Sequence, residues 1–197
     1  MNTYPKLFSP IKIGETTVKN RVFMPPISTN LADKGYVTDA LVEHYAARAK
    51  GGVGLIVTEV TTVEPTYVYL PGDMSICDDS YIPGWEKLTA AVHKYGAKIL
   101  PQLFHPAYMA FPIPGTPRLI APSFVGPYYA KEAPRPVTVE ELQVIIRQFG
   151  EAALRVKKQA LTEWKFTPLM HMDSLADSFP RSTTNGQMPM VEISMDA

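Results

Sequence analysis

The sequence predicts an α/β protein, and more narrowly an incomplete (β/α)8 TIM barrel. Short apolar runs alternate with longer amphipathic segments, the order typical of parallel strands connected by helices. This alternation alone allows either a doubly wound sheet or a closed barrel. Two further observations favour the barrel: no Gly-x-Gly-x-x-Gly turn follows the first strand, and long proline-rich loops follow the strand ends.

The predicted elements are too few to close a barrel. An N-terminal hairpin and the first three to four βα units occupy residues 1–158 of the 197-residue chain. A complete barrel has eight strands and typically about 250 residues. We therefore expect residues 1–158 to be the N-terminal part of a barrel, and residues 159–197 to be a tail that does not continue it.

The first predicted elements are a hairpin and a short strand. Residues 7–18, LFSPIKIGETTV, have the alternation of a hairpin with a turn at Gly14. Residues 21–24 form a brief apolar strand. Pro25–Pro26 ends this strand because proline has no N–H to give to a ladder.

Two longer strands are expected further along the chain. Residues 53–57 are a near-continuous apolar run, typical of a parallel strand buried on both faces, and a loop is expected from Thr58 to Ser80. Residues 97–103 form the next strand. Prolines are frequent from Pro101 to Pro136, and residues 111–136 of this stretch predict neither a regular helix nor a central strand.

Three helices are expected to connect and follow these strands. Their N-terminal signals are an N-cap at Thr38, a proline at the first helical position, Pro83, and a capping box formed by Thr138 and Glu141. Glycines end the first two helices, at Gly51–Gly52 and at Gly96. The third helix is expected to run through Lys158.

Composition and charge favour a small-molecule partner. Lys plus Arg and Asp plus Glu both total 19, and no basic stripe indicates binding to nucleic acid or to an anionic membrane. The N-terminus lacks a signal-peptide pattern, and no apolar run approaches the roughly 20 residues of a membrane span. The expected location is therefore the cytoplasm. The single cysteine excludes an internal disulfide, and no His, Cys, Asp and Glu set has metal-ligand spacing.

Three segments carry a resemblance to a known family. In this order and spacing, LFSPIKIGETTVKNRVFMPPIS, GYVTDALVEHYAARAKGGVGLIVTEV and GAKILPQLFHPA resemble the Old Yellow Enzyme family of FMN-dependent oxidoreductases. The resemblance covers residues 5–158 and is strongest to the bacterial branch of enoate and dienoyl reductases and bile-acid-inducible flavin oxidoreductases. It implies an FMN cofactor, NAD(P)H as reductant, and reduction of an activated C=C bond in an enoate or enone.

The resemblance also implies which residues contact the cofactor. It places Pro26, Ile27 and Ser28 along the flavin, and Val60 where the main chain approaches the isoalloxazine, a position at which many relatives have glycine or alanine. It matches Gln102 to a glutamine that binds the flavin's pyrimidine ring, to which an amide can both donate and accept. An ordinary strand-ending turn and a buried structural glutamine are the alternatives for the first and last of these.

The remaining aromatic and histidine candidates have weaker assignments. Tyr36 resembles a tyrosine on the substrate side of the flavin, but it could equally be a loop aromatic packed on the barrel rim. His105 is interpreted as a structural residue that holds its loop. His44 and His93 lie on predicted helices and are interpreted as surface or capping residues.

The tail, residues 159–197, departs from the family. There the family continues with a G-x-D-G-V-E-[IV]-H strand and a second histidine or asparagine, a pair that binds the substrate carbonyl. With suitable synonymous codons, Ala160 onward can be reread from the last base of the Ala160 codon as ADGVEVHTAH. We therefore hypothesise a frameshift near Lys158–Ala160, which leaves the 197-residue chain an inactive, truncated remnant. The alternative is a genuine tail that folds over the barrel fragment.

Overall fold

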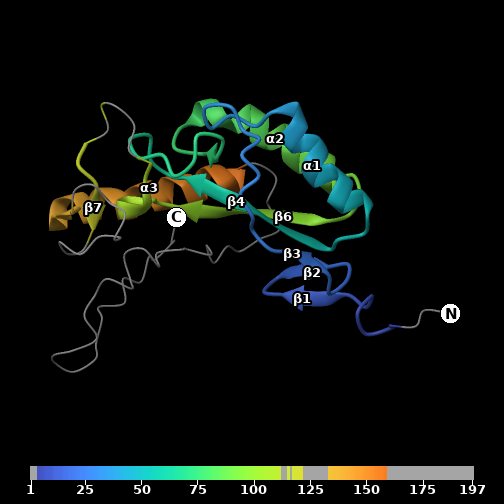
Figure 1. The fold of residues 1–197 in the computed structure, drawn as a ribbon. Helices are drawn as coiled ribbons and strands as arrows, with labels where there is room; N and C mark the ends of the chain where they lie inside the picture. The colour runs from blue at the N-terminus through green and yellow to red at the C-terminus, as the bar shows by residue number, and fades with distance from the viewer. Residues whose placement is uncertain (1–3, 112–114, 116, 122–132, 159–197) are drawn as a thin grey trace, which may run out of the picture.

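A computed structural model describes residues 4–111, 115, 117–121 and 133–158 (Figure 1). The tail expected over residues 159–197 lies outside the described residues. So does much of the proline-rich segment, namely residues 112–114, 116 and 122–132.

The central sheet is parallel, as the apolar runs predict. Its long strands are β4 (Leu55–Thr62) and β6 (Lys98–Phe104), and its short ones are β3 (Phe23–Met24) and β5 (Met74–Ser75). β6 pairs with β4 along nearly its whole length, from Leu55 to Thr62. Because β6 occupies that edge, β3 and β5 share the opposite edge of β4, one at each end.

Strand β4 is longer than the sequence predicts. The expected loop from Thr58 is wrong for its first residues, because the strand continues to Thr62 through a register shift between Val57 and Val60. Thr58 and Glu59 together lie opposite Pro101, the residue between Leu100 and Gln102 on β6. Proline has no N–H to donate to the ladder. Because the bulge interrupts the ladder opposite Pro101, no carbonyl of β4 loses a regular hydrogen bond there.

The described residues form three α-helices, and their caps confirm the predicted signals. The helices are α1 (Asp39–Lys50), α2 (Ile82–His93) and α3 (Val139–Lys158). The Thr38 hydroxyl accepts the Leu41 N–H at 3.2 Å. At α3 the Thr138 hydroxyl accepts the Glu141 N–H at 3.2 Å, and the Glu141 carboxylate accepts the Thr138 N–H at 3.0 Å, which is a complete capping box.

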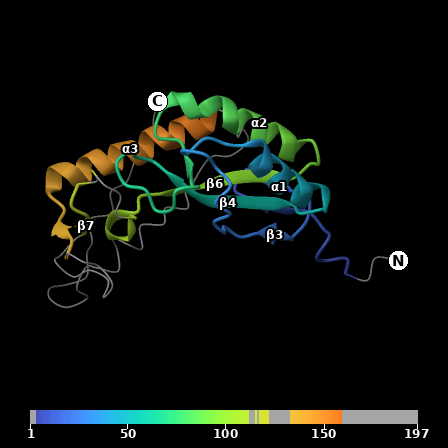
Figure 2. The ribbon, with the colours of Figure 1, turned by 45° about the horizontal axis from the view of Figure 1, so that its top comes forward.

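All three helices lie on one face of the sheet (Figures 1 and 2). The core between helices and sheet consists of fully buried side chains, including Leu41, Tyr45, Ile56, Met74, Trp85, Leu88 and Ile99. The Trp85 indole N–H donates to the Ser75 carbonyl at 3.0 Å, so the largest core side chain leaves no polar atom unpaired. Burial of this one face is the arrangement expected for a barrel wall.

The N-terminal hairpin closes the amino-terminal end of the sheet. It consists of β1 (Ile11–Ile13) and β2 (Thr16–Val18), joined by the predicted turn at Gly14, where φ is +57°. Just after it, Lys19 donates to the Tyr95 carbonyl at 2.7 Å and Asn20 to the Gly52 carbonyl at 2.8 Å, both shortly before a strand begins. The longer loops lie at the other end of the sheet, where the strands have their carboxyl ends.

The other described elements are short. They are the 3₁₀ turns η1 (Asp79–Tyr81) and η2 (Ala107–Met109), and the parallel pair β7 (Ile120–Ala121) and β8 (Arg135–Pro136). This pair lies outside the central sheet, which agrees with the prediction that the proline-rich segment supplies no central strand. No described helix has the length and apolar character needed to cross a membrane.

Candidate functional site

The sheet has one face that the helices do not cover. Ile56 and Ile99 are register partners within the core beneath the helices. The partners on the opposite face, away from that core, are Val57 with Leu100, Val60 with Gln102, and Thr62 with Phe104. In α/β barrels this face lines the barrel, and sites lie where it meets the carboxyl ends of the strands.

Val60 and Gln102 lie side by side on that uncovered face, near the carboxyl ends of their strands. Strict alternation from Val57 would place Val60 beneath the helices, and the bulge at Thr58 and Glu59 returns it to the uncovered face. The structure therefore brings together two of the residues that the sequence analysis assigned to the cofactor, although they are 42 positions apart in the sequence.

Gln102 has the properties expected of a ligand-binding amide. Its side chain is 6% exposed, and within the described part of the chain no hydrogen bond of its amide group to protein is seen. Its amide offers two N–H donors and one carbonyl acceptor. A heterocycle that carries both N–H and C=O groups, such as the pyrimidine ring of FMN, fits this residue.

The loop after β3 brings Pro26, Ile27 and Ser28 to the same end of the sheet. Ile27 is 64% exposed and Ser28 is also exposed. The next residue, Thr29, donates its N–H to the carboxylate of Glu59, the residue before Val60. All five residues that the resemblance assigned to the cofactor thus lie at the carboxyl ends of three adjacent strands.

Tyr36 packs on the rim of the sheet. Its ring stacks on that of Tyr81, with centroids 4.5 Å apart, and its hydroxyl lies 3.0 Å from the Ser80 hydroxyl. Two backbone hydrogen bonds with Asp33, of 3.0 and 2.8 Å, fix the turn that carries it. Tyr36 thus packs on Tyr81, and the residue remains 45% exposed.

Buried acids are the site feature that sequence reasoning missed. Glu59, Glu64 and Asp73 are 0%, 4% and 5% exposed, respectively. Burial raises the pKa of Glu59 and of Glu64, and it raises the pKa of Asp73 to about 6, with a further contribution from the charge of Glu59. One signal was available: Glu59 lies two residues after the apolar run 53–57, which predicts a strand buried on both faces.

A cavity of about 360 Å³ lies beside the strand ends rather than on the Val60–Gln102 pair. Residues from three loops line it, among them Lys34, Glu64, Tyr67, Asp73, Tyr81 and Phe111. From β4 it includes Thr62, and it includes none of the five residues assigned to the cofactor. We therefore take the sheet face, and not this hollow, as the candidate site.

The histidines have structural environments. The Nδ1 atom of His105 accepts the Ala107 N–H at 3.1 Å, which confirms that it holds its loop, and burial lowers the pKa of this imidazole to about 4. The interpretation of His44 as a surface residue is wrong for its Nε2 atom, which is buried without a hydrogen-bond partner among the described residues. The described residues contain no His, Cys, Asp and Glu cluster that could hold a metal ion.

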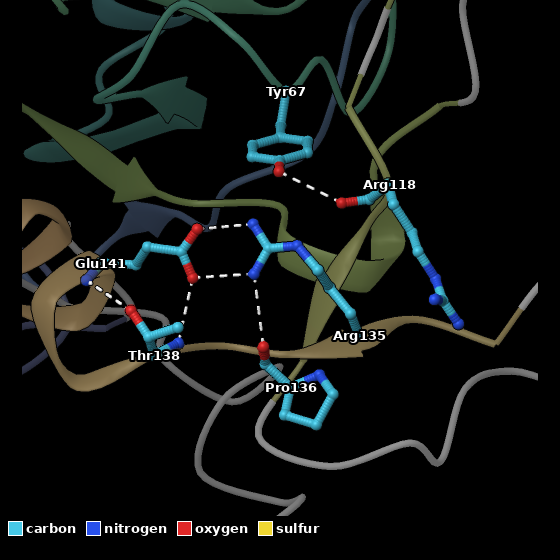
Figure 3. Close-up of polar contacts among 6 residues, drawn as sticks. All are labelled: Tyr67, Arg118, Arg135, Pro136, Thr138 and Glu141. Atoms are coloured by element: carbon cyan, nitrogen blue, oxygen red, sulfur yellow. Dashed lines mark hydrogen bonds and ion pairs between the residues drawn. The ribbon is translucent and has the colours of Figure 1, made fainter.

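A polar network ties the proline-rich segment to the body of the protein (Figure 3). The Tyr67 hydroxyl donates to the Arg118 carbonyl at 3.3 Å. The Arg135 guanidinium makes a two-pronged contact with Glu141, at 2.8 and 2.5 Å, and this contact lowers the pKa of Glu141 to about 2. The loop after β4, the β7–β8 pair and the start of α3 are thereby connected.

Comparisons with known proteins agree over the same part of the chain. A family model described as "NADH:flavin oxidoreductase / NADH oxidase family" matches residues 6–161. The NADH oxidase of Thermoanaerobacter brockii is 40% identical over 160 residues, which are 80% of this chain and 25% of that protein.

Two solved structures resemble the fold. Morphinone reductase in complex with tetrahydroNAD matches with a TM-score of 0.72 and 25% identity, over 79% of this chain and 47% of its own. Old Yellow Enzyme from Pichia sp. AKU4542 matches with a TM-score of 0.71 and 26% identity, over 79% and 43%. The chain thus spans between a quarter and just under half of the length of these three proteins.

Proposed function

The chain belongs to the NADH:flavin oxidoreductase / NADH oxidase family, and from this membership we propose that residues 1–158 are the N-terminal part of an FMN-dependent ene-reductase. The family resemblance and the incomplete barrel predicted from the sequence are both confirmed. FMN and a nicotinamide are the cofactor and reductant of this family. The proposed reaction of the whole protein transfers hydride from NAD(P)H to an activated C=C bond of a small enoate or enone.

The observation that carries this proposal is the Val60–Gln102 pair on the uncovered sheet face. Gln102, buried and without a protein partner in the described residues, is proposed to hold the pyrimidine edge of FMN. Val60 and the loop residues Pro26, Ile27 and Ser28 are proposed to line the flavin. When bound, FMN supplies hydride acceptance and donation, while these residues bind and orient it.

Tyr36 is proposed to lie on the substrate side of this site. The residue is 45% exposed and stacks on Tyr81 through one ring face, so the other face is proposed to contact a small molecule. An aromatic face and a phenolic hydroxyl suit a conjugated carbonyl compound, which is flat and has one hydrogen-bond acceptor.

The second candidate function is that of an inactive remnant, and it concerns the 197 residues by themselves. The family match ends at residue 161, next to the proposed frameshift at Lys158–Ala160. In the family, the strand that carries the substrate-binding histidine would follow there. Sequencing the DNA across these codons tests the frameshift, and codons that do not reread as the family strand contradict it.

Flavin binding by the purified chain tests the proposed site. We expect FMN to bind weakly, with an affinity reduced about 5-fold in Gln102→Leu, because one hydrogen-bonded contact is worth roughly 1 kcal/mol. Gln143→Leu, on an exposed position of α3, is the matched control and should bind as the parent does. Equal affinity of all three proteins contradicts the assignment of Gln102, and NAD(P)H oxidation by the chain alone contradicts the inactive remnant.

A further inference from the structure

Glu59 lies behind the loop that carries the proposed flavin residues. It belongs to the bulge of β4, and the residue is 0% exposed. Its backbone N–H donates to the Tyr45 hydroxyl of α1 at 2.9 Å. Its carbonyl accepts the hydroxyls of Thr58 and Thr61 at 3.1 and 3.2 Å. Both backbone groups of Glu59 thus have partners within the bulge and on α1, and these contacts fix the point from which its side chain starts.

The Glu59 carboxylate contacts the loop after β3. Its Oε2 atom accepts the Thr29 N–H. Burial raises the pKa of this carboxyl, and hydrogen bonds from Thr29 and Asn30 act in the opposite direction because they favour the ionised form. A charged acceptor binds a backbone N–H more strongly than a neutral one does. The contact therefore joins β4 to a loop that lies 30 positions earlier in the chain.

The segment between β3 and Thr29 makes few backbone contacts. Pro25–Pro26, which follow β3 directly, have no N–H to donate. Among the described residues, neither the Ile27 N–H nor the Ser28 N–H makes a backbone hydrogen bond. In this part of the chain, the Thr29 N–H is thus the next one after β3 that has a partner, and the partner is Glu59.

The segment after Thr29 is fixed by a different part of the protein. The Asn30 side-chain oxygen accepts the Gly72 N–H at 2.7 Å, and the Gly72 carbonyl accepts the Ala32 N–H at 3.0 Å. Neither of these hydrogen bonds involves Glu59. Removal of the Glu59 carboxylate should therefore loosen the loop at Thr29 and upstream of it, where the proposed flavin residues lie.

A second acid contacts the same loop in a different way. The Ser28 hydroxyl lowers the pKa of Asp73, although burial raises it more. The Asp73 Oδ2 atom accepts the Leu70 N–H at 2.9 Å, within its own loop. Asp73 thus contacts a side chain of the flavin-lining segment, whereas Glu59 binds the backbone of the residue that follows this segment.

We propose that Glu59 is a positioning residue, which binds Thr29 to the bulge of β4 and thereby fixes residues 26–28 at the same end of the sheet as Val60. The relevance to flavin rests on the function proposed above, whereas the contact with Thr29 concerns the described residues alone. The register shift that turns Val60 onto the uncovered face also brings Glu59 to this loop. One irregularity of β4 thus positions two parts of the proposed cofactor site.

Amide hydrogen exchange of the full chain, without flavin, tests the contact directly. Glu59→Ala removes the acceptor, so the protection factor of the Thr29 amide should fall by about 10-fold or more, the effect of one hydrogen bond to a charged group. The amides of α2 report the overall stability of the same sample and should change less. Glu59→Gln retains an acceptor oxygen, so its Thr29 protection should lie between those of Glu59→Ala and the parent.

Glu64 provides a matched control for the exchange experiment. It is a second buried glutamate, 4% exposed, and its carboxylate accepts the N–H groups of Thr66, at 2.8 Å, and Tyr67. Glu64→Ala and Glu64→Gln therefore remove the same kind of contact from a different loop. They should lower the protection of Thr66 and Tyr67 and leave that of Thr29 as it is in the parent.

Two outcomes overturn the positioning role. Thr29 protection that is unaltered in Glu59→Ala contradicts the contact itself. An equal fall in the protection of Thr29 in the Glu59 and the Glu64 variants, or of Thr29 and α2 in Glu59→Ala, assigns the effect to a general loss of stability instead.

Titration with FMN, followed by flavin absorbance, distinguishes this proposal from the proposed function. If the parent chain binds FMN, Glu59→Ala should bind it about 5-fold more weakly, because the loop must then be ordered on binding. Glu140→Ala, at an exposed position of α3, should bind as the parent does. Equal affinity of Glu59→Ala and the parent overturns the link between Glu59 and the flavin. If the parent binds no FMN while the exchange results hold, the proposed cofactor site fails in this chain and the role of Glu59 in the loop stands.

Discussion

Gly72 and Asn30 touch through their backbones: a Cβ atom added to Gly72 would lie 2.6 Å from the carbonyl carbon of Asn30. Real Cβ atoms do not approach backbone this closely, so Gly72→Ala must push the two loops apart. We expect a loss of about 1–3 kcal/mol in the free energy of unfolding, the range for overpacked sites, measured by urea denaturation.

Gly150→Ala is the matched control for that variant. Gly150 lies inside α3, and a Cβ there would meet no atom within 4 Å. Alanine in a helix interior is favoured over glycine by roughly 0.5–1 kcal/mol, so this variant should be stabilised. If Gly72→Ala is as stable as the parent, or is stabilised as Gly150→Ala is, the proposed contact between the loops is wrong.

The buried imidazole of His105 predicts a loss of stability in mild acid. Its pKa is about 4 in the folded chain and about 6.5 when unfolded. A depressed pKa favours the neutral form, so the contribution is complete above pH 6.5 and is lost as the pH falls towards 4. We expect a loss on the order of 2 kcal/mol between pH 6.5 and pH 4.5, measured as the shift in the urea midpoint.

His105→Asn isolates that effect, because asparagine does not titrate and its side-chain oxygen can still accept the Ala107 N–H. The variant should have a flatter dependence of stability on pH over this interval than the parent. An unchanged slope would assign the acid sensitivity to other groups.

The contact between Arg135 and Glu141 predicts a small, salt-sensitive contribution to stability. The two side chains are 33% and 38% exposed, which limits the pair to about 0.5–1 kcal/mol despite its two-pronged geometry. Because the pKa of Glu141 is lowered to about 2, this contribution is present above pH 4.5 and disappears as the pH falls through about 2.

A double-mutant cycle with Arg135→Gln and Glu141→Gln measures this coupling. Glutamine at 141 can still accept the Thr138 N–H, so the capping box persists while the ion pair is lost. The coupling energy should decrease at high salt. A coupling that is the same at low and high salt would indicate that packing, and not charge, joins the two residues.

The elements that the sequence predicted correctly have local causes. The hairpin turn at Gly14 requires a positive φ, the helix starts at Thr38 and Thr138 have side-chain caps, and Pro25–Pro26 ends β3. Each signal acts within a few residues of its effect, so it can be read from the chain alone.

The errors come from contacts between distant segments. The second half of β4 is polar in sequence. Glu59 is buried there with hydrogen bonds to α1 and to the loop after β3, and the hydroxyls of Thr58 and Thr61 donate to the Glu59 carbonyl. The buried state of Asp73 depends on how closely Gly72 approaches Asn30. Hydrophobic periodicity contains no information on such pairings.

The candidate site was predictable in part. Alternation along β6 places Gln102 and Leu100 on one face, whereas the orientation of Val60 depends on the bulge opposite Pro101. Identifying that bulge requires knowledge of which residue of β6 faces which residue of β4. The resemblance supplied Val60 without this register, and the register then explained why Val60 lies beside Gln102.

The single inserted residue in β4 acts on the strand as a phase shift. Upstream of it, odd-numbered Val57 faces the barrel interior, and downstream the even-numbered Val60 and Thr62 do. At the shift, Thr58 and Glu59 do not follow the alternation of side chains between the two faces of the sheet. The Glu59 carboxylate instead contacts the loop after β3, where it accepts the Thr29 N–H. Because of the bulge, a side chain of β4 can bind a neighbouring loop instead of facing either the helices or the opposite face of the sheet.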